Sequence, residues 1–467
     1  MRATPTGRRL AGAAAASLAA LVLAGVVGGS PDARTDRRPN VIVVLTDDQR
    51  WDTLDAMPWL SARLREHDGW TSFPAAFATS PLCCPARVTL LTGRTPRHTG
   101  VLRNEDAARL DDDETLATWL HDAGYRTGLI GKYLNRFPFG GLPFVPPGWD
   151  RFIAKTNRAS ATVYRNFDVV DQGHRLHIGH SYATDWLADR AVEFVRTAPR
   201  TRPFFLLFVP SAPHAPWQPA RRDTGSLADE VVEEAPSVVG ALRGAPPWVR
   251  DLPIPGAAQR ARWLDQRRRA DETLGSVDDA LRAIVDALGP RLRNSFVFVL
   301  SDQGFSFGEH RWEGKKCPYD ACVRIPFVVH TTIPAADTRG AIVSTVDIAP
   351  TILSLAGIEE PVAPRGVNLD GVGFADRLEP RLGLLPRSPE AVYLEWAGDA
   401  GVPAWDVVRT LRYKLIRSAD GSEELYDVTG ALGRPDPWET SNRADDPAYA
   451  AVLAHLDSLL RVHLAAG

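Results

Sequence analysis

The sequence has few cysteines. Only four occur among its 467 residues, at Cys83, Cys84, Cys317 and Cys322. Small secreted domains that rely on a disulfide framework are far richer in cysteine, and a structural zinc site requires paired C-x-x-C units that these spacings do not provide. Both classes are therefore excluded, whereas a disulfide between Cys317 and Cys322 and two free thiols there both remain open.

An excess of charge of one sign is also absent. The formal net charge is −3, and no long block of like charges occurs. Proteins that bind nucleic acids carry a basic stripe or patch, so we expect no nucleic-acid partner. Apolar residues make up 44% and charged residues 24% of the chain, as in soluble globular proteins. A chain of 467 residues is long enough to form two domains.

Long hydrophobic runs are limited to one, near the N-terminus. Three arginines within the first nine residues precede an apolar stretch over residues 10–27, and Gly28-Gly29-Ser30 follow it. This order is typical of a secretory signal peptide. A retained membrane anchor is the alternative, disfavoured because the stretch is short and rich in Ala and Gly. Residues 1–30 are therefore predicted to be a signal peptide, which implies a secreted or cell-envelope protein with no stable membrane insertion after cleavage.

Short apolar runs alternate with helical patterns over the first 330 residues. The runs are typical of strands buried on both faces, and they lie at Val41–Leu45, Phe204–Val209, Phe296–Leu300 and Pro326–Val329. A helix with one apolar face is predicted by residues that recur at three- and four-residue steps, namely Leu274, Val277, Leu281, Ile284 and Leu288. The alternation predicts an α/β fold with a large mixed, mostly parallel sheet sandwiched by helices.

Two loose stretches interrupt this pattern. Arg221–Pro255 is rich in Pro, Gly and acidic residues and is interpreted as a surface insertion. The second, from Glu359 to Pro389, separates a predicted catalytic α/β domain (38–358) from a small C-terminal α+β subdomain (385–467). That subdomain is predicted to hold three short strands and a closing helix, at Ala391–Trp396, Lys414–Arg417, Glu424–Tyr426 and Tyr449–Leu464.

The segments directly after the predicted strands carry residues suited to chemistry. They are Asp47-Asp48 after the first strand, Lys132 after the apolar segment 127–130, His214 after Phe204–Val209, and Asp302-Gln303 after Phe296–Leu300. Each has an ordinary explanation alone, since an acid can cap a helix and a lone lysine usually lies on the surface. Because sites in open α/β sheets form at the carboxyl ends of the strands, we interpret these residues as one site.

Three carboxylates and an amide oxygen form a hard, oxygen-rich ligand set. Asp47, Asp48, Asp302 and Gln303 suit Ca²⁺ or Mg²⁺ better than Zn²⁺, which prefers His and Cys. Such a cation is matched by an anionic substrate, which Lys132, His214 and Lys315 could hold. Cationic donors around a metal-bound anion are the usual means of stabilising charge at a phosphoryl or sulfuryl centre.

Cys83 begins a turn that leads into a predicted helix from Ala86 to Thr92. Pro85 suits the first position of a helix, and a group at a helix N-terminus is well placed to meet an anion. The alternative for Cys83 is a buried, inert thiol, the commoner state of a free cysteine.

The run Cys83-Cys84-Pro85-Ala86-Arg87, followed by Leu90–Arg94, resembles the signature of the type I, formylglycine-dependent sulfatases of the alkaline phosphatase superfamily. Its core is C-x-P-x-R, in which a formylglycine-generating enzyme oxidises the first cysteine. Gly131–Asn135 and Pro146–Trp149 resemble the N-acetylglucosamine-6-sulfatase-like branch. The resemblance covers about residues 38–445, with further matches in order at Pro39–Gln49, Ala212–Trp217, Ser301–Gly304, Gly308–His310, Lys315, Tyr319, Arg324, Pro326, Val346–Thr351, Arg412–Lys414 and Glu424–Asp427.

The resemblance implies a sulfuric ester hydrolase that cleaves a sulfate monoester of a sulfated sugar or an aryl sulfate. It implies that Cys83 becomes formylglycine, whose hydrate attacks sulfur with one hydroxyl and expels sulfate through the other. One Ca²⁺ per chain, with Mg²⁺ less favoured, is expected on the modified Cys83 together with Asp47, Asp48, Asp302 and Gln303. Arg87 is expected to steady the formylglycine. The cations Lys132, His214 and Lys315 are expected to hold the sulfate, with His214 or Lys315 protonating the leaving alcohol.

Two positions depart from the family pattern. Gln303 stands where Asn is usual, which keeps the carbonyl ligand but moves it by one methylene. Leu134 stands where many arylsulfatases carry the histidine that releases sulfate, so another group must act here. The glucosamine-6-sulfatase branch shares this Leu, and His310 is a candidate for a supporting role.

Two other functions remain open. A phosphonate monoester or phosphodiester hydrolase can also use formylglycine, and a non-catalytic protein that binds sulfated glycans is a rival of another class. Gly131–Asn135 and Pro146–Trp149 favour a sulfatase over the first, and the joint presence of Cys83, Arg87 and the three cations argues against the second. A sulfated amino sugar is the expected substrate. Its specificity is assigned to the Arg221–Pro255 insertion, an Asp168–His180 loop and the C-terminal subdomain.

Overall fold

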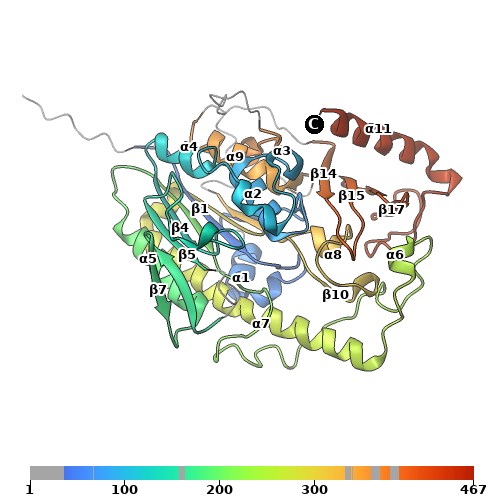
Figure 1. Ribbon diagram of the computed structural model, residues 1–467, viewed down its shortest axis with the longest axis horizontal. Coiled ribbons are helices and arrows are strands. Elements are labelled where there is room, and N and C mark those ends of the chain that lie inside the picture. The colour runs from blue at the N-terminus through green and yellow to red at the C-terminus, as the bar shows by residue number, and fades with distance from the viewer. Residues whose placement is uncertain are drawn as a thin grey trace, which may run out of the picture. The chain divides into compact units, whose positions relative to one another are not determined.

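Nine strands among the described residues pair into one mixed sheet (Figure 1), and the short apolar runs of its central strands β9, β1 and β8 are buried on both faces. The central strands β9, β1, β8, β4 and β5 run parallel, and antiparallel strands complete both edges. In spatial order the strands are β2 (Trp70–Ser72), β12 (Phe327–His330), β9 (Ser295–Ser301), β1 (Asn40–Thr46), β8 (Phe204–Val209), β4 (Arg126–Gly131), β5 (Arg151–Lys155), β6 (Phe167–Asp171) and β7 (His174–Ile178). The predicted mixed, mostly parallel sheet is confirmed.

The computed structural model describes residues 36–66, 68–156, 164–331, 338, 340–358, 369–378 and 389–466. The predicted signal peptide lies outside these residues, as does most of the loose stretch from Glu359 to Pro389. The predicted domain boundaries stay predictions.

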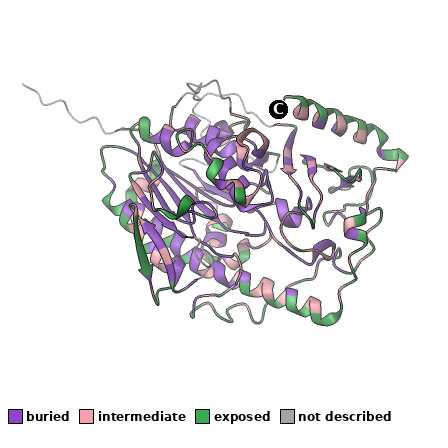
Figure 2. Cartoon of the chain, in the orientation of Figure 1, coloured by how far each residue is buried: buried purple, intermediate pink, exposed green. Residues whose placement is uncertain are grey.

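Helices cover both faces of the sheet. Successive side chains along a strand point to opposite faces, so each central strand packs against both helical layers. In β1, Val41, Val43 and Leu45 join the core on one face, whereas Ile42 and Val44 join the core on the other. Figure 2 shows these central strands as buried. The first layer contains α2 (Cys83–Thr92), α4 (Leu116–Asp122), α9 (Ile348–Leu355) and α10 (Ala375–Leu378). The second contains α1 (Pro58–Glu66), α5 (Ala183–Thr197) and α7 (Ala257–Leu288).

A separate antiparallel sheet of four strands lies in the C-terminal region of the described residues. Its strands are β14 (Ala391–Trp396), β15 (Trp405–Thr410), β16 (Tyr413–Ser418) and β17 (Glu423–Asp427). One face packs on α11 (Ala450–Ala466) through Val408, Leu415 and Leu456, and the other joins a core shared with Phe77 and Tyr319. This arrangement fits the predicted α+β subdomain.

Smaller elements connect these layers. Short helices are α3 (Pro96–Thr99), α6 (Pro247–Arg250) and α8 (Asp320–Val323). Two short ladders pair β3 (Ala75–Phe77) with β13 (Ile342–Ser344), and β10 (Ser306–Phe307) with β11 (Glu313–Gly314).

Four local expectations were wrong or incomplete. The Asp168–His180 segment is not a loop but the hairpin of β6 and β7, whose outer strand is exposed and therefore lacks an apolar pattern. The strand β15 was missed because charged residues interrupt its apolar ones. Helix α2 begins at Cys83, not at Ala86, because a proline is tolerated anywhere in the first turn, where its missing N–H has no partner. Helix α7 begins 17 residues before Leu274, in a segment dominated by arginine.

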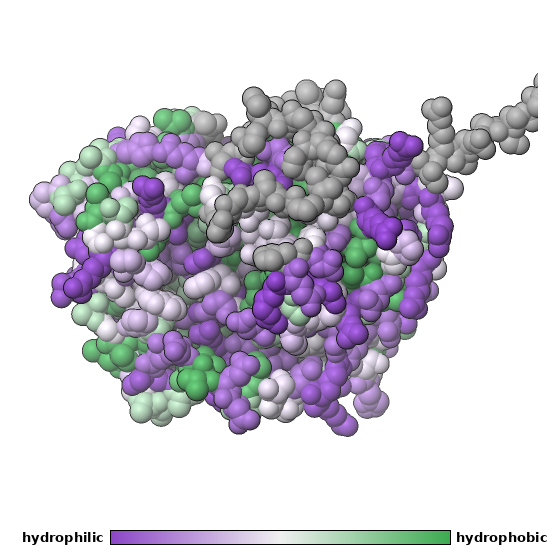
Figure 3. All heavy atoms as spheres, turned by 180° about the vertical axis from the view of Figure 1, so that it is seen from behind, coloured by the Kyte–Doolittle hydropathy of each residue, from purple (hydrophilic) through white to green (hydrophobic). Residues whose placement is uncertain are grey.

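The surface offers no single hydrophobic face among the described residues. Seen from behind, hydrophobic residues form small groups between hydrophilic ones (Figure 3). The most exposed large apolar side chains, Leu142, Val231, Ile254 and Val462, lie on separate elements. No described helix combines the length and the apolar composition that a bilayer-spanning helix needs.

Gly131 ends β4 directly before Lys132, at a point where the backbone of β8 approaches closely. Its φ is +132°, and a Cβ there would lie 1.9 Å from the carbonyl oxygen of Val209. Gly140, with φ +68°, has no atom within 4 Å of the same added carbon. We expect Gly131→Ala to lower the free energy of unfolding by more than about 3 kcal/mol, and Gly140→Ala by only about 1–2 kcal/mol of left-handed strain. Urea unfolding of both variants checks this, and equal losses would contradict the close approach at Gly131.

Candidate active site

The ends of neighbouring parallel strands bring the predicted polar residues to one edge of the main sheet. In the spatial order β9, β1, β8, β4, the chain leaves the sheet at Asp302, Asp47, toward His214 and at Lys132. Backbone hydrogen bonds extend the pairing beyond the strands, since Asp302 N–H donates to Thr46 O at 3.1 Å and Lys132 N–H donates to Val209 O at 2.8 Å. The structure therefore brings these residues together.

Three carboxylates form the floor of the site. Asp47, Asp48 and Asp302 are buried, with exposed fractions of 0%, 4% and 1%. Asp48 adopts a left-handed backbone conformation with φ +71°, and its N–H donates to Asp302 Oδ1 at 3.1 Å. Although burial opposes ionisation, the charge of Lys132, together with those of His214 and Arg87, lowers the pKa of Asp47. Burial, and then the negative charge of Asp47, raises the pKa of Asp302. The floor thus concentrates more negative charge than ordinary burial tolerates.

Cys83 lies at the first turn of α2, facing this floor. Its Sγ is 3.7 Å from Asp47 Oδ1, 3.1 Å from Lys315 Nζ and 3.6 Å from Gln303 Nε2. Burial raises the pKa of the Cys83 thiol, even though Lys132 and Lys315 act in the opposite direction. The encoded thiol is therefore protonated near neutral pH and a poor nucleophile.

Arg87 lies one turn after Cys83 and joins the helix to the carboxylates. Its Nε donates to Asp302 Oδ2 at 2.8 Å, and its Nη1 donates to the carbonyl oxygen of Lys132 at 2.8 Å. The Nη2 group is 3.5 Å from Asp47 Oδ2. Burial alone would lower the pKa of Arg87, but the charges of Asp302 and Asp47 raise it. Arg87 is therefore permanently charged and fixes the helix relative to three strand ends.

Three cationic side chains surround the position of Cys83. Lys132 Nζ donates to Asp47 Oδ2 at 2.5 Å, and Lys315 Nζ lies 2.7 Å from Asp48 Oδ1. His214 Nδ1 contacts the carbonyl oxygen of Ala215 at 2.8 Å, so its Nε2 is the atom that faces the site, 3.6 Å from Asp48 Oδ2. Burial, followed by the charge of Lys315, lowers the pKa of His214. An anion in contact with Cys83 would therefore meet two ammonium groups and one imidazole.

The donor atoms fit a hard divalent cation. Within the described part of the chain, Asp48 Oδ2 and Gln303 Oε1 are buried oxygen atoms without a hydrogen-bond partner. Ligand atoms of Asp47, Asp48, Cys83 and His214 all lie within 4.8 Å of one another. Unpartnered buried oxygens are costly unless a donor or a cation satisfies them. This geometric group includes His214, which was not among the predicted ligands, and Gln303 adds the free amide oxygen that the longer side chain was expected to supply.

Lys155 was missed by the sequence analysis. It ends β5 next to β4, is 2% exposed, and its Nζ donates to Ser211 Oγ at 2.9 Å in the turn that leads to His214. Burial, reinforced by the charge of Lys132, lowers the pKa of Lys155 to about 7. The sequence did not show that β5 lies next to β4, so Lys155 could not be assigned to the site. A further signal was present, because the chain has only five lysines among 54 basic residues, and three of them are buried: Lys132, Lys155 and Lys414.

Two other predicted positions lie away from the carboxylates. His310 is buried, its Nε2 contacts Glu439 O at 2.8 Å, and its ring stacks on Tyr319 at 3.5 Å. These contacts give it a packing role, and the supporting role in catalysis stays a prediction. Leu134 is 2% exposed and packs in the core of the first helical layer.

A disulfide closes the loop beside Lys315. Cys317 and Cys322 are bonded, which settles the open alternative. The carbonyl oxygens of Lys315 and Lys316 accept hydrogen bonds from the indoles of Trp312 and Trp405, both at 2.8 Å. The loop that presents Lys315 is therefore held by a covalent bond and two indole donors, of which that of Trp405 is buried and that of Trp312 partly buried.

Family models match most of the chain. The Sulfatase model matches residues 39–358, and the model of the C-terminal region of N-sulphoglucosamine sulphohydrolase matches residues 308–465.

Curated relatives agree with this match. The extracellular sulfatase SULF-1 homolog of Drosophila melanogaster is 31% identical over 347 residues, which cover 70% of this chain. The chain spans only 30% of that protein, and 49% of the corresponding homolog of Caenorhabditis elegans. The N-acetylglucosamine-6-O-sulfatase of Bacteroides thetaiotaomicron is 26% identical over 516 residues, which cover 95% of this chain and 89% of that protein.

Solved structures share the fold. That of BT4656 in complex with its substrate D-glucosamine-2-N,6-O-disulfate superimposes with a TM-score of 0.76 at 24% identity and covers 91% of this chain and 97% of that chain. The phosphonate monoester hydrolase of Agrobacterium radiobacter gives a TM-score of 0.69 at 21% identity over 91% of this chain and 96% of that chain. At these identities the likeness concerns the fold alone. Because the Sulfatase model spans well over half of the sequence, this chain belongs to the sulfatase family.

Proposed function

We propose that the chain hydrolyses sulfate monoesters of sulfated sugars at the position of Cys83. One observation carries the proposal: Cys83 lies at a helix N-terminus between Asp47 and Lys315, at 3.7 Å and 3.1 Å. A nucleophile there would meet a cation-binding floor on one side and sulfate-binding ammonium groups on the other. This combination matches the requirements of sulfuryl transfer, in which charge must be stabilised on the transferred group.

The proposed nucleophile derives from formylglycine made at Cys83 by a formylglycine-generating enzyme. The support is the C-x-P-x-R run from Cys83 to Arg87 and the raised pKa of the thiol, which makes the unmodified residue a poor nucleophile. Once hydrated, the aldehyde supplies a nucleophilic hydroxyl and a second hydroxyl that allows sulfate to leave. Cys84 has a different role, since its Sγ accepts a hydrogen bond from Asn135 N–H at 3.0 Å in the helical layer.

The proposed cofactor is one Ca²⁺, held by Asp47, Asp48, Asp302 and Gln303. The support is the hard donor set and the two unpartnered oxygens, Asp48 Oδ2 and Gln303 Oε1. When bound, the ion supplies positive charge that binds a sulfate oxygen and favours ionisation of the nucleophile. Ca²⁺ is preferred over Mg²⁺ because it tolerates the irregular geometry that the longer Gln303 side chain imposes.

The lysine and histidine side chains of the site would bind the sulfate and protonate the leaving alcohol. Lys132 and Lys315 stay protonated, since the charges of Asp47 and Asp48 respectively outweigh the effect of burial and raise their pKa values. His214 presents only Nε2 to the site, because Nδ1 is engaged by Ala215 O. Lys315 Nζ can therefore deliver a proton to the leaving alcohol, and His214 Nε2 can do so when the ring is in its imidazolium form. Lys155, through Ser211, would keep the His214 turn in place.

The proposed substrate class is a sulfated amino sugar. The support is the name of the Bacteroides relative, an N-acetylglucosamine-6-O-sulfatase that matches nearly the whole chain. Export through the N-terminal segment is also proposed, because two relatives are named as extracellular or Sulf-1-like sulfatases. A phosphonate monoester or phosphodiester hydrolase is the second candidate, favoured only by its shared fold.

Kinetics of the matured protein test the function. We expect kcat/KM for an aryl sulfate to exceed that for the matching aryl phosphodiester, because three cations are arranged for a monoester anion. Cys83→Ala should lower sulfatase activity on the order of a thousandfold or more, whereas Cys84→Ser, the matched control, should retain most of it. A preference for the phosphodiester would favour the second candidate. Sulfated-sugar binding without turnover in the matured wild type would favour a non-catalytic binding protein.

Lys155 provides a pH-dependent prediction for stability. Its pKa in the folded state is about 7, below the ordinary value of 10.5. Between these values the unfolded chain binds a proton that the folded chain does not, so the free energy of unfolding rises with pH. Lys155→Met removes the cost of burying the charge. We therefore expect it to stabilise the fold by about 1–3 kcal/mol below pH 7, with the gain vanishing above pH 10.5.

Urea unfolding at pH 6, 8 and 10 measures this effect. The matched control is Lys316→Met, because Lys316 is partly exposed and pairs with Asp399 at the surface. A loss of stability in Lys155→Met that does not change with pH would show that the lysine is held by ordinary packing instead.

A further inference from the structure

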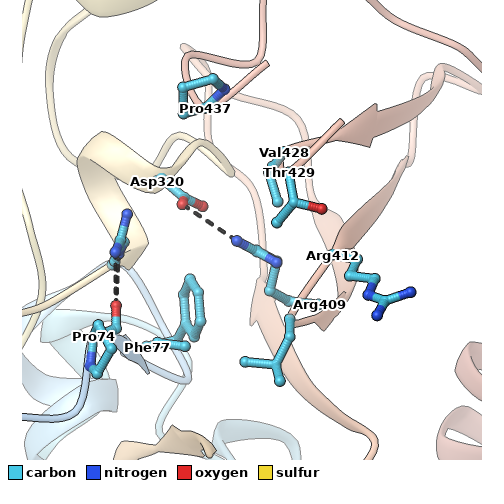
Figure 4. A pocket seen from close by; sticks show the side chains of 11 residues that line it. Pro74, Phe77, Asp320, Arg409, Arg412, Val428, Thr429 and Pro437 are labelled. Atoms are coloured by element: carbon cyan, nitrogen blue, oxygen red, sulfur yellow. Dashed lines mark hydrogen bonds and ion pairs between the residues drawn. The ribbon is translucent and has the colours of Figure 1, made fainter. Parts of the chain in front are cut away.

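A cavity of about 400 Å³ lies apart from the catalytic residues, between the Pro74–Phe77 segment, the end of α8 and the C-terminal sheet (Figure 4). Volumes of this order are typical of small-molecule sites. None of the residues that line it belongs to the carboxylates, lysines or histidine described above. The function proposed for the catalytic residues therefore leaves the cavity unexplained.

The cavity is lined by more cationic than anionic charge. Arg324 follows α8, Arg409 and Arg412 belong to the β15–β16 hairpin, and Asp320 is the acid among the described lining residues. Asp320 is already matched, because its carboxylate lies 3.0 Å from Lys414 Nζ and 3.7 Å from Arg409 Nη2. In Figure 4 the guanidinium of Arg409 extends toward Asp320, while Arg412 lies to the outer side. Arg324 and Arg412 have no carboxylate partner among the described residues.

Arg324 is held in place without a counter-charge. Its Nε and Nη2 donate to the carbonyl oxygen of Pro74 at 3.1 and 2.7 Å, and its guanidinium lies 4.0 Å from the centre of the Trp51 ring. Burial lowers the pKa of Arg324, and the charge of Arg409 lowers it further, while that of Asp320 acts in the opposite direction. Pro74 engages the Nε and Nη2 edge, so an anion would meet the Nη1 end of the guanidinium. A half-buried guanidinium with fixed orientation and no ion pair is prepared to bind an anion there, because its charge is permanent.

Apart from Thr429, the rest of the described lining is apolar. Phe77, Val428 and Leu411 contribute side chains, and Pro74 and Pro437 add flat, rigid surfaces. An anion without a carbon framework would leave this surface uncovered. The C–H face of a sugar ring fits it, because apolar contacts with a few placed polar groups are the usual composition of a ligand site.

We propose that this cavity binds a sulfated or carboxylated sugar residue of the same glycan whose sulfate ester occupies the catalytic site. The identity of the glycan rests on the proposed function, whereas the anion site rests on Arg324, Arg409 and Arg412. Arg324 engages the anionic group, and Arg412 at the rim attracts it from solvent. Arg409 faces Asp320 and adds positive charge to the wall of the cavity.

A short segment connects the two sites. Lys315 contacts Cys83 at one end of it, and Arg324 lines the cavity at the other. Nine residues span at most about 32 Å when fully extended, and the Cys317–Cys322 disulfide prevents full extension. The two sites therefore lie within about 32 Å of each other, a span that a glycan of several sugar residues can cover.

The test measures binding in the absence of turnover. Full-length chain carrying Cys83→Ala is titrated calorimetrically with sulfated, uronate-containing oligosaccharides of two to eight sugars. Arg324→Gln and Arg412→Glu are compared with Arg461→Glu, a matched charge change on α11 outside the cavity. We expect the first two to weaken octasaccharide binding five- to tenfold and disaccharide binding less than twofold, and Arg461→Glu to change neither. Arg412 is exposed in a turn, so its variant remains informative where Arg324→Gln fails to fold.

Three outcomes overturn the proposal. Octasaccharide binding that neither cavity variant weakens excludes the site, and equal losses in Arg461→Glu assign the effect to general attraction between charges. Arg324-dependent binding of inorganic sulfate, with no gain from chain length, assigns the cavity to a small free anion instead. Turnover of an aryl sulfate by the matured wild type is measured separately, so that failure of the proposed function is distinguished from failure of this assignment.

Discussion

The buried charge of Asp47 is the constraint on which the site depends. This carboxylate has no exposed surface at the end of β1, one of the inner strands of the sheet, and the nearby Lys132, His214 and Arg87 keep it ionised. A single buried charge would cost several kcal/mol, so the folded site requires these partners next to the carboxylate. Because Arg87 lies on α2, its contacts with Asp47 and Asp302 fix the position of the helix. The position of Cys83, in the first turn of the same helix, is thereby fixed as well.

The charges around Asp47 are arranged so that the site can bind a cation and an anion at the same time. Asp48 and Asp302 add negative charge to the floor, while Lys315 and His214 add positive charge around Cys83. Ions bound between these two sets would satisfy the unpartnered oxygens of Asp48 and Gln303. Lys155 is a further buried charge, on the neighbouring strand β5. Its burial is tolerated near neutral pH because the lowered pKa means that the ammonium group is partly deprotonated.

Strand order explains how much of this could be predicted from the sequence. The residues after β1, β4, β8 and β9 were predictable because each follows an uninterrupted apolar run, and parallel strands end at one edge. Lys155 was not, since β5 was not recognised as a strand, and its direct parallel pairing with β4 is a tertiary feature that the sequence does not display. The start of α2 at Cys83 was missed because Pro85 is compatible with any position in the first turn and does not mark the first residue. The cavity at Arg324 joins segments some 250 residues apart, which no local pattern indicates.

The central claim is that the residue at position 83 is remade before it acts. The measurement that tests it most directly is mass spectrometry of the peptide that contains Cys83 and Cys84, from protein co-expressed with a formylglycine-generating enzyme. The account predicts a peptide in which sulfur is replaced by oxygen and two hydrogens are lost at position 83, with the thiol of Cys84 unchanged. An unmodified Cys83 thiol in protein that is fully active on a sulfate ester would contradict it.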